Sequence, residues 1–164
     1  MADQQLTGIL LVGGTSSRFG SPKELAEFEG GTLADRAWRL LADTCDERFA
    51  VGPGGLADPG TGPVAAIATG LRAARHELAI VIPVDMPLLT PDALRVLAEA
   101  CRDAATAQRG PLPCAVARRT LPAFETGERR LRTVLDGLDT ARIQLDEELL
   151  ANVNTPTDLD TLTS

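Results

Sequence analysis

The chain has 164 residues, 44% of them hydrophobic, and carries a formal net charge of −7 at pH 7. This length predicts one domain spanning residues 1–164, and no apolar run approaches the roughly 20 residues that a membrane-spanning helix needs. The acidic balance, the lack of tyrosine and the absence of any basic run longer than two residues argue against an extended nucleic-acid-binding surface.

The N-terminus, MADQQLTG, is polar and lacks the basic and apolar regions of a signal peptide. We therefore expect a cytoplasmic protein with neither nucleic acid nor membrane among its partners.

Cysteine and histidine are scarce. Cys45, Cys101 and Cys114 are odd in number and far apart, which predicts reduced, structural thiols. The single histidine, His76, nearly excludes His-based metal sites and Ser-His-Asp triads. We expect His76 to be exposed near a helix end.

The first half of the chain alternates between strand and helix patterns. Thr32 and Asp35 form a capping box, and Pro63 suits the first turn of a helix. The expected elements are a buried, parallel strand at Thr7–Val12, a helix at Thr32–Ala42, a weak strand at Arg48–Val51, a loop at Gly52–Pro63 and a helix at Val64–Arg75.

The second half continues this alternation. The expected elements are a strand at Leu78–Val84, a helix from Thr90-Pro91 to about Ala104, a strand at Pro113–Arg118, a helix at Gly127–Leu138, a strand at Ala141–Leu145 and a C-terminal helix opened by Thr155-Pro156-Thr157-Asp158. Strand and helix in alternation predict an α/β fold with a mainly parallel sheet.

A glycine pair and the only lysine of the chain follow the first strand. Gly13 and Gly14 would let backbone N–H groups approach an anion closely, and Lys23 and Arg18 would add positive charge. The segment is neither a Walker A motif nor a GxGxxG motif. The pattern favours a phosphate site, and the alternative is a solvated surface lysine.

Two further polar features fall where strands are expected to end, at the edge of the sheet where α/β proteins bind ligands. Asp85 follows the clearest strand and is placed to hold Mg²⁺, although it could be a turn or capping residue. Asn152 and Asn154 are the only asparagines, and Asn154 could offer an amide oxygen to a metal, with ordinary turn chemistry as the alternative. Asp58 is interpreted as a turn residue, and the alternative is a contact with a nucleotide or a metal.

The order of these motifs is informative. It runs LLVGGTSSRFGSPK, GPVAAIATGL, VDMPLL, GERRL and NVNTPTDL. This order resembles the molybdenum cofactor guanylyltransferase family, over nearly the whole chain. The resemblance implies a three-layer, Rossmann-like nucleotidyltransferase fold. It also implies Mg²⁺-dependent transfer of GMP from GTP to the terminal phosphate of the molybdopterin cofactor, with release of pyrophosphate.

The resemblance also implies roles for single residues. Lys23, Asp85 and Arg18 would be catalytic, with Lys23 on the phosphates, and Asp85 would bind Mg²⁺. Asn154 would be a second metal ligand or a contact on the pterin side. The nucleotide would be bound by Leu11, Val12, Gly13, Gly14, Lys23, Asp58 and Asp85.

The chain departs from the family pattern at several positions. Val12 stands where alanine is usual and Ala66 where glycine is usual, and the segment GPGGLADPG lacks the usual asparagine. The usual His-Pro pair near the acceptor is missing, with Ala117-Arg118-Arg119 roughly there. Two alternatives therefore stay open: a related transferase that uses CTP or another acceptor, and a non-catalytic nucleotide- or partner-binding module. A cofactor-insertion protein or a molybdoenzyme is a further expected partner.

Overall fold

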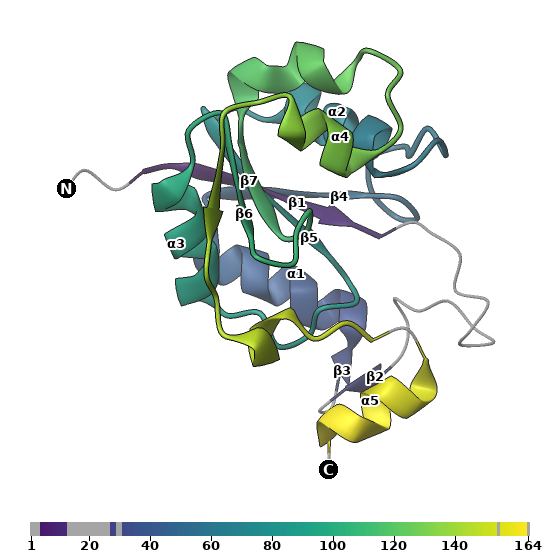
Figure 1. Ribbon diagram of the computed structural model, residues 1–164. Helices are drawn as coiled ribbons and strands as arrows, with labels where there is room; N and C mark the ends of the chain where they lie inside the picture. The colour runs from purple at the N-terminus through teal and green to yellow at the C-terminus, as the bar shows by residue number, and fades with distance from the viewer. Residues whose placement is uncertain (1–3, 13–26, 29–30, 154, 164) are drawn as a thin grey trace.

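The computed structural model describes residues 4–12, 27–28, 31–153 and 155–163. Its centre is a six-stranded sheet in the order β4-β1-β5-β7-β6-β8 (Figure 1). The six strands are β1 (Leu6–Leu11), β4 (Glu47–Val51), β5 (Leu78–Pro83), β6 (Ala104–Ala107), β7 (Cys114–Ala117) and β8 (Thr140–Ile143). A separate antiparallel pair is formed by β2 (Glu27–Phe28) and β3 (Gly31–Thr32).

Helices cover both faces of the sheet, which confirms the three-layer α/β arrangement. The helices are α1 (Leu33–Thr44), α2 (Pro63–Ala73), α3 (Pro91–Ala100), α4 (Leu131–Asp136) and α5 (Pro156–Thr163), with 3₁₀ helices η3 (Arg118–Phe124) and η4 (Glu147–Leu150). Figure 1 shows α1 and α3 on one face and α2 and α4 on the other. None of these helices in the described part of the chain is long and apolar enough to span a membrane.

The expected helix starts are present. The Thr32 hydroxyl accepts a hydrogen bond from the Asp35 amide at 3.0 Å. Thr155 and Asp158 form both bonds of a capping box at 3.1 Å each. The Thr90 hydroxyl caps α3 in the same way, through the Ala93 amide. Helix starts of this kind can be predicted from the sequence, because the capping side chains bind nearby amides that the helix itself leaves unpaired.

All strands of the large sheet run in one direction except β7. β1 pairs in parallel with β4 and β5, and β6 pairs in parallel with β8, whereas β7 is antiparallel to β5 and β6. The carboxyl ends of five strands therefore lie along one edge of the sheet, together with the start of β7. We call this the carboxyl edge.

Two helices expected in the second half of the chain have other bounds in the structure, and one strand there was not predicted. The helix expected to reach Ala104 ends at Ala100, and β6 follows it. The segment Ala104–Ala107 has the sequence AATA, which lacks the alternation of apolar and polar residues typical of a strand. Its composition favours a helix, but its pairing with β7 and β8 makes it a strand. The helix expected from Gly127 begins only at Leu131, and Arg118–Phe124 forms a 3₁₀ helix.

The three cysteines are free thiols, as expected. Burial raises the pKa of Cys45 and of Cys114 to about 12, and that of Cys101 to about 11. Thiols of this kind stay protonated at neutral pH and are poor nucleophiles.

A cluster of polar groups around the half-buried Glu47 carboxylate lies at the edge opposite to the carboxyl edge. The side chain of His76 is only 18% exposed there, so the expectation of an exposed histidine was wrong. His76 lies 3.9 Å from Glu47, which accepts hydrogen bonds from the Thr7 hydroxyl at 2.5 Å and the Arg75 amide at 2.6 Å. Burial disfavours the Glu47 carboxylate, but these hydrogen bonds and the electrostatic effect of His76 and Arg75 outweigh it and lower its pKa.

This cluster predicts a pH-dependent contribution to stability. We expect Glu47→Gln to lower the free energy of unfolding at pH 7 by about 1–2 kcal/mol, since it weakens hydrogen bonds to a charged acceptor. Because the folded-state pKa is lowered, this stabilisation is present above the unfolded-state pKa and is lost as the pH falls through the folded-state pKa.

Urea unfolding of both proteins across this pH range checks the prediction. Glu99→Gln, on the exposed side of α3, is the control and should change little at any pH. A gap between wild type and Glu47→Gln that does not close on acidification would contradict this account of the cluster.

Candidate active site

The carboxyl ends of three neighbouring strands are in register. Leu11, the last residue of β1, is paired with Val51 of β4 on one side and with Pro83 of β5 on the other. The amide of Val12 continues the pairing, with a 3.0 Å hydrogen bond to the Val51 carbonyl. The segments that follow these three strands therefore begin side by side, as ligand sites of α/β folds require.

Some of the expected site residues lie outside the described part of the chain. These are Gly13, Gly14, Arg18, Lys23 and Asn154. Among the residues that the structure describes, Leu11 is half-buried and Val12 is buried. The side chain of Val12 packs in the apolar core, so its backbone is the part that could contact a nucleotide.

The loop after β4 is folded back on itself by its own backbone. The Leu56 amide donates to the Ala50 carbonyl at 2.7 Å, and the Gly52 amide donates to the Leu56 carbonyl at 2.9 Å. Asp58 is exposed, and its Oδ1 atom accepts the Gly60 amide at 2.8 Å. One carboxylate oxygen of Asp58 is thus used in a local turn, as its turn interpretation predicts.

Helix α2 begins where this loop ends. Gly62 precedes it with a φ of 107°, a backbone conformation that favours glycine, and Pro63 is its first residue. The N-terminus of a helix has partial positive charge and unpaired amides, which attract phosphate. The start of α2 therefore adds a second anion-attracting feature beside the end of β4.

Asp85 lies in the loop Val84–Leu89 that follows β5. The residue is half-buried, and its Oδ1 atom is buried. Its backbone carbonyl accepts a 2.7 Å hydrogen bond from the Val153 amide. Val153 stands between the two asparagines in the sequence, so the structure brings Asp85 and the NVN motif together.

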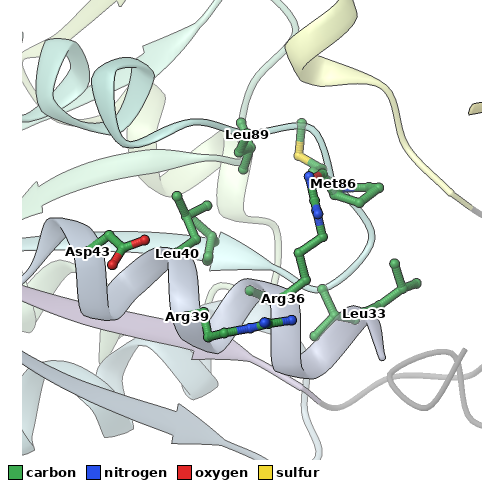
Figure 2. A pocket seen from close by; sticks show the side chains of 11 residues that line it. Leu33, Arg36, Arg39, Leu40, Asp43, Met86 and Leu89 are labelled. Carbon is green, nitrogen blue, oxygen red and sulfur yellow. The ribbon is translucent and has the colours of Figure 1, made fainter. Parts of the chain in front are cut away.

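Arg36 of α1 also contacts the loop Val84–Leu89. Its Nε atom donates to the Pro87 carbonyl at 2.5 Å. Beside this contact lies a pocket of about 330 Å³ between α1 and the Val84–Leu89 loop, and Figure 2 shows the Arg36 side chain reaching from α1 toward Met86. The pocket is lined by Leu33, Arg36, Ala37, Arg39, Leu40, Asp43, Ile82, Val84, Met86, Pro87 and Leu89.

A second pocket, of about 530 Å³, lies beside α2 and includes part of the GERRL motif. Arg129 from this motif donates through Nε to the Thr61 carbonyl at 3.2 Å, directly before α2. The motif was identified in the sequence, but no contact of Arg129 was predicted. A hydrogen bond from a side chain to a distant backbone carbonyl leaves no pattern in a single sequence.

The residues that stand roughly where the family has its His-Pro pair, Ala117-Arg118-Arg119, lie away from the carboxyl edge. Because β7 is antiparallel, Ala117 is paired with Leu78 at the start of β5, and Arg118 and Arg119 follow at the edge away from the site. Arg119 is paired there with Asp103. The segment that does reach the carboxyl edge is the β6–β7 connection, residues 108–113.

The donor set at Asp85 fits a hard divalent cation. No group of three or more His, Cys, Asp or Glu that could hold a metal occurs in the described parts of the chain. Mg²⁺ does not need such a group, since it is usually bound by one or two carboxylates together with water and substrate phosphates. A single buried carboxylate oxygen at the end of β5 is compatible with this kind of site.

Curated relatives match nearly the whole chain. Two relatives are named "Probable molybdenum cofactor guanylyltransferase". The relative from Deinococcus radiodurans is 33% identical over 178 residues, covering 94% of this chain and 92% of the relative. The relative from Mycobacterium avium is 33% identical over 194 residues, covering 99% and 98%.

Solved structures share the fold. A nucleotidyl transferase from Methanothermobacter has a TM-score of 0.83 at 19% identity, covering 98% of this chain and 96% of that chain. The molybdopterin-guanine dinucleotide biosynthesis protein A from Archaeoglobus fulgidus has a TM-score of 0.75 at 22% identity, covering 94% and 95%. A Mycobacterium tuberculosis protein in complex with manganese has a TM-score of 0.74 at 15% identity, covering 97% and 98%.

The family model described as the MobA-like NTP transferase domain matches residues 8–143, which include β1, Asp58, Asp85 and the β6–β7 connection. Since this match covers most of the chain, the chain belongs to the family of MobA-like NTP transferase domains.

Proposed function

We propose that this protein transfers GMP from GTP to the terminal phosphate of the molybdopterin cofactor. An oxygen of the acceptor phosphate forms a bond to the α-phosphorus of GTP, the bond from that phosphorus to the bridging oxygen breaks, and pyrophosphate leaves. The observation that carries the proposal is the contact between Asp85 and Val153, which joins the expected metal ligand to the NVN motif. Relatives of 33% identity over nearly the full chain, named as probable guanylyltransferases of this cofactor, support it.

The chain's own residues would act mainly by positioning and charge neutralisation. Lys23 and Arg18 would neutralise the triphosphate, and the backbone from Leu11 to Gly14 and the Asp58 carboxylate would hold the nucleoside. No general base is required, because a phosphate nucleophile is already anionic at neutral pH. In-line displacement at phosphorus depends on this kind of electrostatic support.

We propose Mg²⁺ as the cofactor, held by the Asp85 carboxylate with the Asn154 amide oxygen as a second ligand. Bound there, the ion would polarise the α-phosphate and neutralise charge that develops on the leaving group. The manganese-bound structural neighbour is compatible with a divalent cation in this fold.

The direct test is a comparison of triphosphates. The protein is incubated with GTP, ATP or CTP, together with Mg²⁺ and molybdopterin, and pyrophosphate and dinucleotide product are measured. We expect the highest rate with GTP. A higher rate with CTP would instead indicate a cytidylyltransferase, and absence of product with every triphosphate despite GTP binding would indicate a non-catalytic module.

The assigned residues are tested by substitution. We expect Lys23→Ala and Asp85→Asn each to lower kcat at least about tenfold, a loss of ~1.4 kcal/mol of transition-state stabilisation. Asp92→Asn is the matched control, because the Asp92 side chain is 95% exposed in the first turn of α3. Rates near that of wild type for both Lys23→Ala and Asp85→Asn would show that the site is misplaced.

Metal dependence is tested separately. We expect a chelator to abolish turnover and excess Mg²⁺ to restore it. In Asp85→Asn, the Mg²⁺ concentration for half-maximal rate should rise about tenfold or more, since an amide oxygen is a weaker ligand than a carboxylate. Turnover that persists in chelator would exclude the metal assignment.

A further inference from the structure

The segment from β8 to Val153 is held at both of its ends. We call residues 144–153 the connecting segment; in Figure 1 it runs from β8 through η4 toward the yellow α5. One end begins beside Gln108, at the carboxyl end of β6, and the other end binds Asp85 through the Val153 amide. The connecting segment therefore joins the β6–β7 connection to the residue that follows β5.

Gln108 binds the start of the segment through both atoms of its amide. Its Nε2 donates to the Leu145 carbonyl at 2.6 Å, and its Oε1 accepts the Leu145 amide at 2.9 Å. These bonds imitate a backbone pairing and extend the β6–β8 ladder beyond its last pair, Ala107 and Ile143. The Nε2 group also donates to Glu147 Oε1 at 3.2 Å, so both of its N–H groups have acceptors.

The segment between the two ends has little freedom to shift. Leu145 is 8% exposed and Leu150 1% exposed, and both pack in the core that α1 and α3 cover. Val153 is fully buried against Leu33. If Leu145 moved, the side chains packed around it would have to move as well, and the displacement would extend to the Val153 amide.

This arrangement also fixes the direction of Asn152. In an extended chain, successive side chains point to opposite sides, so the burial of Val153 agrees with the exposure of Asn152. A one-residue slip that brought Asn152 to the place of Val153 would bury the asparagine and expose the valine.

We propose that Gln108 is a positioning residue for Asp85. By fixing Leu145, it sets the register in which the Val153 amide meets the Asp85 carbonyl, and thereby the place of the Asp85 carboxylate at the carboxyl edge. The proposal rests on the proposed guanylyltransferase function for its kinetic consequence and on the contacts above for its structural one. Gln108 itself touches neither nucleotide nor metal in this scheme.

The kinetic test uses Gln108→Met, which keeps the side-chain length and removes both hydrogen-bonding groups. We expect the Mg²⁺ concentration for half-maximal rate to rise at least about fivefold, the scale of one lost net hydrogen bond, because the Asp85 carboxylate would be held less firmly. We expect kcat at saturating Mg²⁺ to fall less than about twofold, because Gln108 contacts neither substrate in this scheme. Gln144→Met makes the same change on an exposed side chain one position before Leu145, and should alter neither value.

The second readout does not depend on turnover. Hydrogen exchange at the Val153 amide should be at least about tenfold faster in Gln108→Met than in Gln144→Met, since its contact with Asp85 would open more often. If Gln108→Met does not fold, Gln108→Glu provides the comparison, because it keeps an acceptor for the Leu145 amide and loses the donor.

The outcomes separate the two proposals. Unchanged exchange at Val153, or a fall in kcat with no change in the Mg²⁺ concentration for half-maximal rate, would overturn the positioning role. If the wild-type protein forms no dinucleotide product, transfer to molybdopterin is wrong, and exchange at Val153 alone decides whether Gln108 positions the segment.

Discussion

The hydrogen bond from the Val153 amide to the Asp85 carbonyl connects the last part of the chain to the central strands of the sheet. A single bond of this kind contributes only about 1 kcal/mol net, so it cannot hold the segment alone. It is supported by the burial of Val153 and by the pairing of Leu145 with Gln108. The expected metal ligand, Asp85, is thus fixed through its backbone.

Charge is distributed in a way that suits a local anion site in an acidic protein. Several arginines pair with carboxylates on the surface, among them Arg102 with Asp139 and Arg142 with Asp136, and their side chains are about half exposed. Exposed pairs of this kind contribute little stability and neutralise each other. In the proposed reaction, binding a triphosphate to a chain of net charge −7 would therefore depend on a few local cations, such as Lys23, and on a divalent ion.

Much of the fold was predictable because its signals are local. The apolar run of β1, the Thr32 cap and the Thr155–Asp158 capping box each depend on residues close together in the sequence. Strand β6 was missed because four small residues become a strand only through partners on β7 and β8.

The place of Asp85 directly after a strand was predictable from the sequence, and its role in the site stays a prediction. The structure adds its contact with Val153. Gln108 and Arg129 were missed because each acts through a bond to a backbone carbonyl far along the chain. The antiparallel direction of β7 was also missed, because it cannot be inferred from the strand's own sequence.

The departures from the family pattern have different consequences on the two sides of the site. Val12 and Ala66 are buried in the two apolar cores, so their changed side chains are accommodated by packing. The β6–β7 connection, in contrast, lies at the carboxyl edge, where Arg132 donates to the Gly110 carbonyl at 2.8 Å. If the proposed transfer takes place at this edge, changes in the connection alter the surface beside the reacting groups, whereas changes in the core do not. The proposed acceptor is therefore the part of the reaction in which this chain has most room to differ from its relatives.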